Sequence, residues 1–274
     1  MAKLGEINYL RNHGEAAVRH AMHKPFSDVN CPKYLVEIGT VMSLLPPPPA
    51  RILDIGCGAG WTSVFFAKAG YHVVGVDIAP DMIFHADQVR RKEGLDNLQF
   101  QVCDYEEMSF QDEFDGAVFF DSLHHAVDEE AAVRMAFRAL KPQGVCVTSE
   151  PGQGHKDTPI AVEAVRKYNV TEKDMPPEKI VAMGREAGFR RHWIFPYAFD
   201  LNHLIFSTTK EGPYQRPIRK RRWFKRLFHW LLIGRLGLGS RLFSTKTTEL
   251  YWFRNLAHFF NRVHLNGGIV VLEK

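Results

Sequence analysis

Cysteine is scarce in this chain, and its placement excludes the sites that paired cysteines form. The 274 residues include four cysteines, and no two of them have the spacing of a metal-binding or redox pair. Residues 1–10 also lack the basic start and apolar run of a secretory signal. We therefore expect a protein with reduced cysteines, located in the cytoplasm.

Long apolar runs are also missing. The longest mainly apolar stretch, residues 227–233, contains His229 and is far shorter than the ~20 residues that a membrane-spanning helix needs. Any contact with a membrane is expected to be peripheral. Hydrophobic residues make up 45% of the chain and charged residues 24%, proportions that exclude a disordered or fibrous protein.

Acidic side chains are absent from residues 212–248, which carry ten basic ones. The whole chain has a formal net charge of +4, so the remainder is net acidic. Between Arg219 and Leu232, helical spacing separates basic side chains from tryptophan, phenylalanine and leucine. A basic amphipathic helix of this kind suits an anionic membrane surface, which would give peripheral binding at the inner membrane surface.

The same helix has two other interpretations. Its apolar side could pack on the sheet or on a second subunit, with the basic side exposed to water. The helix could also bind the phosphate of a nucleotide sugar or of a nucleic acid, although a nucleic acid is disfavoured because the rest of the chain is net acidic and shows no known binding module. The sequence does not set the oligomeric state.

Four stretches follow one another along the chain. Residues 1–49 are expected to form an N-terminal helical cap that ends at four consecutive prolines. Residues 50–199 alternate short β-branched runs with helical patterns, residues 200–266 form the basic and aromatic insertion, and residues 267–274 read as a final strand. We expect strands at 51–55, 72–77, 98–103, 116–121 and 144–149, and helices at 62–69, 80–93, 129–140 and 180–187.

This alternation predicts an α/β fold with a parallel sheet covered by helices on both faces. The loop after the first strand is rich in glycine, with Gly56, Gly58 and Gly60 close together. Glycines at such a turn let the backbone bend sharply and approach a ligand closely. The third glycine comes one residue too early for the dinucleotide pattern G-x-G-x-x-G, which disfavours a nicotinamide-dependent oxidoreductase.

Acidic residues mark the ends of the first three strands. Asp54 lies in the first, Asp77 ends the second, and Asp104 follows the third. The carboxyl ends of parallel strands meet at one edge, where α/β folds bind ligands. A carboxylate at the end of the second strand can accept both hydroxyl hydrogens of a ribose, and Asp104 can accept from the amine of adenine.

Together these segments resemble a class I S-adenosylmethionine-dependent methyltransferase of the small-molecule type 11 family. The resemblance implies a Rossmann-like, seven-stranded, mostly parallel sheet whose last two strands, at 191–197 and 268–272, are antiparallel, with a late α-helical insertion between them. It also implies a cofactor, S-adenosyl-L-methionine, held by the following residues: Asp54, Gly56, Cys57, Gly58, Gly60, Asp77, Ile78, Asp104, Tyr105 and Asp121.

Two histidines, His124 and His125, follow the fourth strand, where members of this family face the transferring methyl group. An imidazole with a pKa of ~6.5 can accept a proton near neutral pH. We expect one of the two to orient or deprotonate the acceptor. No metal site is expected, because His124 and His125 with Asp121 and Asp128 do not form a recognised ligand pattern. Residues 151–177 are expected to be a loop.

The sequence therefore predicts a methyltransferase that acts by in-line displacement on a small-molecule or lipid- or glycan-linked acceptor. Oxygen or carbon is the expected methylated atom. The chain also lacks the Asn-Pro-Pro-Tyr segment that adenine- and glutamine-modifying relatives carry after the fourth strand, which argues against DNA adenine modification. An alternative is a non-catalytic S-adenosylmethionine sensor or scaffold. The acceptor itself is not specified by the sequence.

Overall fold

A computed structural model describes residues 3–200 and 267–274. The late insertion lies outside the described residues. It includes the basic amphipathic segment predicted between Arg219 and Leu232. Within the described part, no helix is both long and apolar enough to cross a membrane.

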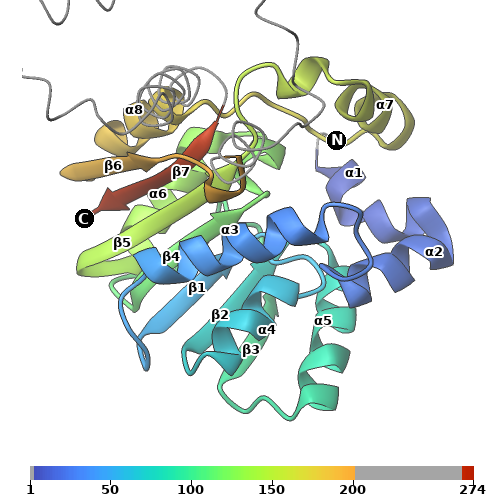
Figure 1. Cartoon of the computed structure of the whole chain (residues 1–274), viewed down its shortest axis with the longest axis horizontal. Helices are drawn as coiled ribbons and strands as arrows, with labels where there is room; N and C mark the ends of the chain where they lie inside the picture. The colour runs from blue at the N-terminus through green and yellow to red at the C-terminus, as the bar shows by residue number, and fades with distance from the viewer. Residues whose placement is uncertain (1–2, 201–266) are drawn as a thin grey trace, which may run out of the picture. The chain divides into compact units, whose positions relative to one another are not determined.

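Seven strands form one sheet in the order β3-β2-β1-β4-β5-β7-β6. The first five strands run parallel, whereas β7 pairs antiparallel with both β5 and β6. Figure 1 shows the last strand of the chain inserted between β5 and β6. The strands are β1 (Arg51–Ile55), β2 (His72–Asp77), β3 (Leu98–Val102), β4 (Phe114–Phe120), β5 (Leu140–Glu150), β6 (Arg191–Phe195) and β7 (Gly268–Glu273).

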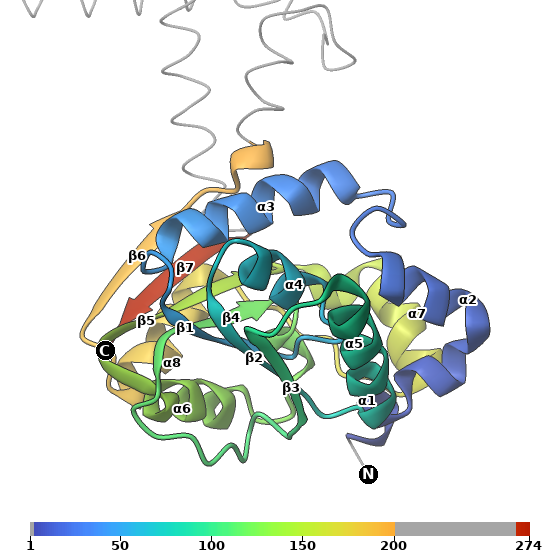
Figure 2. The same ribbon diagram turned by 90° about the horizontal axis from the view of Figure 1, so that it is seen from below.

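Helices cover both faces of the sheet (Figure 2). One face packs on α3 (Cys31–Leu44), α4 (Trp61–Lys68) and α5 (Pro80–Glu93), and the other on α6 (Glu129–Ala139) and α8 (Pro177–Ala187). The strands supply both cores because their side chains alternate: Ile52 faces the first core, while Leu53 faces the second. This confirms the predicted fold class for the described residues.

The N-terminal helices α1 (Leu4–Ile7) and α2 (Tyr9–His23) lie beside α7 (Pro159–Tyr168) in both views (Figures 1 and 2). The ring centroids of Tyr9 and Tyr168 are 6.5 Å apart. The sequence predicted a loop for residues 151–177, and this prediction is wrong for residues 159–168, which form α7. The helix begins after Thr158, whose side chain accepts from the amide of Ala161, and it ends at Asn169 in the left-handed region.

The carboxyl ends of the parallel strands meet at one edge of the sheet. The β1–α4 loop, the turn after β2 and the short helix η1 (Leu123–His125) after β4 all lie at this edge. A second short helix, η2 (His155–Asp157), follows β5. The residues that the sequence predicts to be functional are therefore brought to one side of the sheet.

Candidate active site

The β1–α4 loop has a left-handed backbone at three glycines. The positive φ angles are those of Gly56 (+72°), Gly58 (+54°) and Gly60 (+82°). A Cβ on Gly56 would lie 2.5 Å from the Cβ of Ser122, so this loop directly contacts the turn after β4. The amides of Gly56 and Cys57 donate to the carbonyl of Val76 at 2.8 and 3.0 Å. These bonds hold the loop against β2.

Asp54 lies beneath this loop and is 1% exposed. Its Oδ2 accepts hydrogen bonds from the hydroxyls of Thr62 and Ser63, at 2.6 and 2.5 Å. Burial raises the pKa of the Asp54 carboxyl to about 6, although the two hydroxyls partly oppose the shift. The side chain thus ties β1 to the first turn of α4. The predicted contact with the methionine part of the cofactor stays a prediction.

Asp77 ends β2 with its carboxylate turned toward the glycine loop. The Gly58 amide donates to Oδ2 at 2.9 Å, and the Ala79 amide donates to Oδ1 at 2.9 Å. Each carboxylate oxygen can accept a second hydrogen bond, so both retain acceptor capacity for the hydroxyls of a ribose. Burial raises the pKa of Asp77, while the two amide donors oppose this shift. Ile78, the next residue, is half-buried.

Asp104 and Tyr105 lie at the end of β3 but face different surroundings. Asp104 accepts from the Lys3 ammonium at 2.5 Å and from the Glu106 amide at 3.0 Å. The Tyr105 ring is buried beside Phe119, and its hydroxyl donates to the Ser122 carbonyl at 3.0 Å. Tyr105 therefore links the end of β3 to the turn after β4.

Asp121 follows β4 with a left-handed backbone, φ +54°. Its amide donates to the Ser149 carbonyl at 2.9 Å, and the residue is exposed. Burial together with the nearby Asp121 carboxylate raises the pKa of the Tyr34 hydroxyl on α3. The strained turn at Asp121 directs the chain into η1, where the two histidines lie.

A buried carboxylate, Glu150 at the end of β5, holds this turn. Its Oε1 accepts from the amides of Ser122 and Leu123 at 2.9 and 2.8 Å. Its Oε2 lies 2.7 Å from Nδ1 of His124 and 3.3 Å from the His124 amide nitrogen, which donates to it. Burial disfavours a charged His124, but the Glu150 hydrogen bond and charge outweigh it and raise the His124 pKa.

His125 is held differently from its neighbour. Its Nδ1 lies 2.7 Å from the carbonyl oxygen of Thr171, which can only accept, so Nδ1 carries the hydrogen and Nε2 keeps its lone pair. Burial and the neighbouring His124 lower the pKa of His125 well below its usual value. The two ring centroids are 3.9 Å apart. His125 is thus a neutral imidazole beside one whose charged form is favoured.

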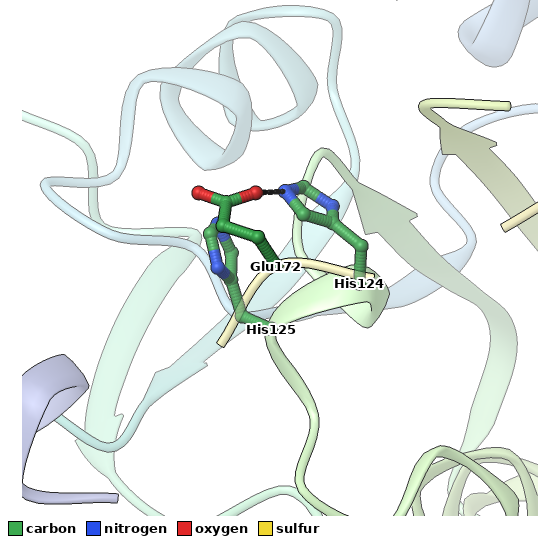
Figure 3. A group of neighbouring side chains, drawn as sticks. All are labelled: His124, His125 and Glu172. Atoms are coloured by element: carbon green, nitrogen blue, oxygen red, sulfur yellow. Dashed lines mark ion pairs between the residues drawn. The ribbon is translucent and has the colours of Figure 1, made fainter. Parts of the chain in front are cut away.

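A second carboxylate, that of Glu172 in the connection between α7 and α8, lies beside the histidine pair (Figure 3). Its Oε2 lies 3.6 Å from Nε2 of His124 and 2.7 Å from Nε2 of His155. Sequence reasoning did not identify Glu172, which is far from the pair along the chain. It also did not identify Glu150, although Glu150 ends a strand as Asp77 does, and that signal could have found it.

The N-terminal helices are tied to this edge by charged side chains. Glu6 of α1 accepts from the Thr171 amide at 2.8 Å and lies 3.6 Å from Nδ1 of His125. Burial raises the Glu6 pKa to about 7. Arg11 of α2 pairs with Asp81 at the start of α5, at 2.6 Å. These helices therefore lie next to both the histidine pair and the turn after β2.

These residues fit an adenosyl ligand on two observations. The Asp77 carboxylate retains acceptor capacity on both oxygens, and a Cβ added to the adjacent Gly58 would meet no atom nearer than Met82 Sδ at 4.0 Å. The remaining predicted contacts are brought to the same edge of the sheet. Asp54 and Tyr105 already have hydrogen-bond partners within the protein.

The chain is similar to known methyltransferases. Residues 48–197 match the family model described as "Methyltransferase domain". A ubiquinone biosynthesis O-methyltransferase of Hydrogenovibrio crunogenus is 28% identical over 150 residues, covering 50% of this chain and 61% of the relative. A 24-methylenesterol C-methyltransferase 2 of Oryza sativa subsp. japonica is 33% identical over 161 residues, covering 54% and 44%.

Another relative is named for a reaction other than methyl transfer. An S-adenosyl-L-methionine-dependent Diels-Alderase of Talaromyces variabilis is 35% identical over 136 residues, which cover 45% of this chain and 46% of the relative. The chain thus spans about half the length of the curated relatives that it matches.

Among solved structures, the phosphoethanolamine N-methyltransferase 2 of Haemonchus contortus in complex with S-adenosyl-L-methionine matches with a TM-score of 0.60 and 19% identity. The match covers 99% of this chain and 58% of that one. At this identity, the likeness supports the fold alone.

Proposed function

The chain belongs to the family of S-adenosylmethionine-dependent methyltransferase domains, and on this premise we propose that it methylates a small-molecule or lipid- or glycan-linked acceptor. An oxygen or carbon atom is the proposed methylated position, because relatives include an O-methyltransferase and a C-methyltransferase.

The observation that carries this proposal is the Asp77 carboxylate beside the glycine loop. Two backbone amides fix its orientation and leave acceptor capacity on both oxygens, which suits the two hydroxyls of a ribose. The cofactor supplies an electrophilic methyl group on a sulfonium sulfur. The protein's part is then to hold the acceptor atom in line with the methyl–sulfur bond and to exclude water.

The histidine pair is proposed to orient or deprotonate the acceptor. His125 is neutral and keeps a lone pair on Nε2, so it can accept a proton from an acceptor hydroxyl. His124 is held by Glu150 and favours the charged form, so it can orient the acceptor by donating a hydrogen bond. Both side chains follow β4, and Ser122 of the same turn contacts the glycine loop at Gly56.

The test is an incubation of the whole chain with methyl-labelled S-adenosylmethionine and a fractionated host extract that includes the lipids. We expect label in one fraction, and mass spectrometry of that fraction identifies the acceptor. Tight cofactor binding without any labelled product would favour the alternative of a sensor or scaffold, or a use of the cofactor without methyl transfer, as the name of the Diels-Alderase relative suggests. No cofactor binding would contradict the proposal.

We further propose that the segment between Arg219 and Leu232 binds an anionic membrane surface from the cytoplasmic side. The support is its sequence, in which basic residues and bulky apolar residues separate at helical spacing. Sedimentation with anionic vesicles should show binding that weakens at high salt. The triple variant Arg222→Glu, Lys225→Glu and Arg226→Glu should remain in the supernatant. Vesicle binding that changes neither at high salt nor in the variant would leave only the interpretation in which the apolar side of the helix packs on protein.

A further inference from the structure

His124, His125 and Glu172 form a compact cluster of side chains that can bind metal ions. One ligand atom from each residue lies within 4.8 Å of the others. Figure 3 shows the Glu172 carboxylate beside both imidazole rings. The three side chains come from two separate segments, the turn after β4 and the connection between α7 and α8.

Each of these side chains is held by a hydrogen bond to a residue outside the cluster. Nδ1 of His124 bonds Glu150 and Nδ1 of His125 bonds the Thr171 carbonyl, both at 2.7 Å. Oε2 of Glu172, the oxygen that faces His124, also bonds Nε2 of His155 at 2.7 Å. Metal-binding histidines typically hold the remote ring nitrogen in this way, against a carboxylate or a backbone carbonyl. When His124 is neutral, this arrangement leaves Nε2 of both rings free to bind a metal ion.

From this arrangement we infer that His124, His125 and Glu172 form a binding site for a divalent transition-metal ion of the zinc type. Two imidazole nitrogens and one carboxylate oxygen are a ligand set of zinc and related ions, whereas Mg²⁺ and Ca²⁺ prefer oxygen ligands throughout. Zinc in tetrahedral geometry, with ligands at about 2.0–2.2 Å, separates them by about 3.3–3.5 Å. The 3.6 Å between His124 and Glu172 is close to that spacing, and side-chain rotation can close the remaining gaps.

Charge and exposure suit the same ion. The surroundings include the carboxylates of Glu150 and Glu172, so an added positive charge is attracted to the cluster. The His125 side chain is 30% exposed, which gives the site an opening to solvent. Three protein ligands leave at least one position for an oxygen of water or of the acceptor.

The ion site itself is independent of methyl transfer, but its role rests on the proposed function. A bound ion takes the Nε2 lone pairs of both histidines, so these residues would then orient an acceptor oxygen through the ion rather than accept its proton. Such an acceptor would carry a hydroxyl or another oxygen able to bind the ion.

The test uses the full chain after removal of metal with a chelator. Titration with Co²⁺ is followed by visible absorption, which reports the coordination of the ion, and Zn²⁺ affinity is then measured by competition. We expect one site, with affinity for Zn²⁺ far above that for Mg²⁺. Binding of S-adenosylmethionine is measured on the same samples.

Three variants test the assignment of the metal ligands. Glu172→Gln removes a ligand and should weaken Zn²⁺ binding at least about 100-fold, whereas His155→Gln removes an outer partner and should cost about 10- to 100-fold. His72→Gln, at the exposed start of β2 and the opposite edge of the sheet, should leave affinity unchanged. Circular dichroism checks that each variant is folded. If Glu172→Gln does not fold, His155→Gln provides the test.

The experiment distinguishes failure of the metal-site proposal from failure of the proposed methyltransferase function. Intact cofactor binding without a Co²⁺ or Zn²⁺ site, or with a site of equal affinity in wild type, Glu172→Gln and His155→Gln, would overturn the metal site alone. A metal site with the expected variant pattern, in a chain that does not bind S-adenosylmethionine, would support the site and reject the proposed function.

Discussion

Oε2 of Glu150 lies 2.7 Å from Nδ1 of His124, within a pair in which both side chains are almost fully buried. The same carboxylate also accepts from the amides of Ser122 and Leu123. One acidic side chain at the end of β5 therefore fixes both the backbone of the turn after β4 and the ring that this turn carries. Glu150 is a positioning residue for the histidine pair.

Replacing this carboxylate by an amide should destabilise the turn. In Glu150→Gln, the amide group cannot accept at both ends, so an NH₂ would face N–H donors that are buried. We expect the free energy of unfolding to fall by about 1–3 kcal/mol, measured by urea denaturation. Glu163→Gln, an exposed substitution on α7, should change it by less than about 0.5 kcal/mol. Equal stability of both variants would contradict the role given to Glu150.

Asp77 should dominate recognition of the cofactor ribose. Asp77→Asn removes the charge and replaces one acceptor oxygen by a donor, so each lost charge-assisted bond costs about 1.5–3 kcal/mol. Calorimetric titration with S-adenosylmethionine should therefore show affinity reduced at least about 10-fold. Asp96→Asn, at an exposed position before β3, serves as the control and should bind as wild type does. Unchanged affinity in Asp77→Asn would reject the ribose assignment.

Gly56 should tolerate no side chain, for two separable reasons. Its φ of +72° is strained for alanine, by about 1–2 kcal/mol, and a Cβ would also lie 2.5 Å from the Cβ of Ser122. Gly94 has a similar φ of +64° but open space around it. We expect Gly56→Ala to lower the melting temperature more than Gly94→Ala and to weaken cofactor binding, which Gly94→Ala should leave intact. Similar losses in both variants would mean that backbone strain alone accounts for the effect.

The buried Asp54 should make stability depend on pH. Its folded-state pKa of about 6 lies above the ordinary 3.8, so between these values the folded chain binds more protons than the unfolded chain. The contribution of Asp54 is therefore complete below pH 4 and is lost as the pH rises to about 6. At about 1.4 kcal/mol for each pKa unit, the loss amounts to a few kcal/mol.

Comparison with Asp54→Asn isolates this effect from other titrating groups, such as Glu6. The free energy of unfolding of wild type, measured by urea denaturation at pH 4 to 7, should fall relative to that of the variant as pH rises. A difference that stays constant over this range would show that Asp54 is ionised in the folded protein at every pH tested.

The parallel strands could be predicted from the sequence because each is a short stretch containing β-branched or aromatic residues, with glycine, proline or acidic residues nearby. Helix α7 could not, because Ile160, Val162 and Val165 on it are exposed and do not mark a buried face. Its cap residues, Thr158 and Asn169, were the available signal.

The glycine loop and Asp77 could also be predicted, since a strand end places them by topology. Glu172 could not be, because its approach to His124 depends on how the α7–α8 connection folds back over the turn after β4. No local pattern encodes a contact between segments so far apart in sequence. Glu150 is an intermediate case, because its place at a strand end is visible in the sequence while its partners are not.

The central claim is that the edge formed by the β1–α4 loop and the end of β2 binds S-adenosylmethionine. A crystal structure of the full chain with this cofactor tests it most directly. We expect the ribose hydroxyls on the Asp77 carboxylate and the methionine part against the loop from Gly56 to Gly60. A cofactor bound elsewhere, or an edge closed by protein side chains, would contradict the claim.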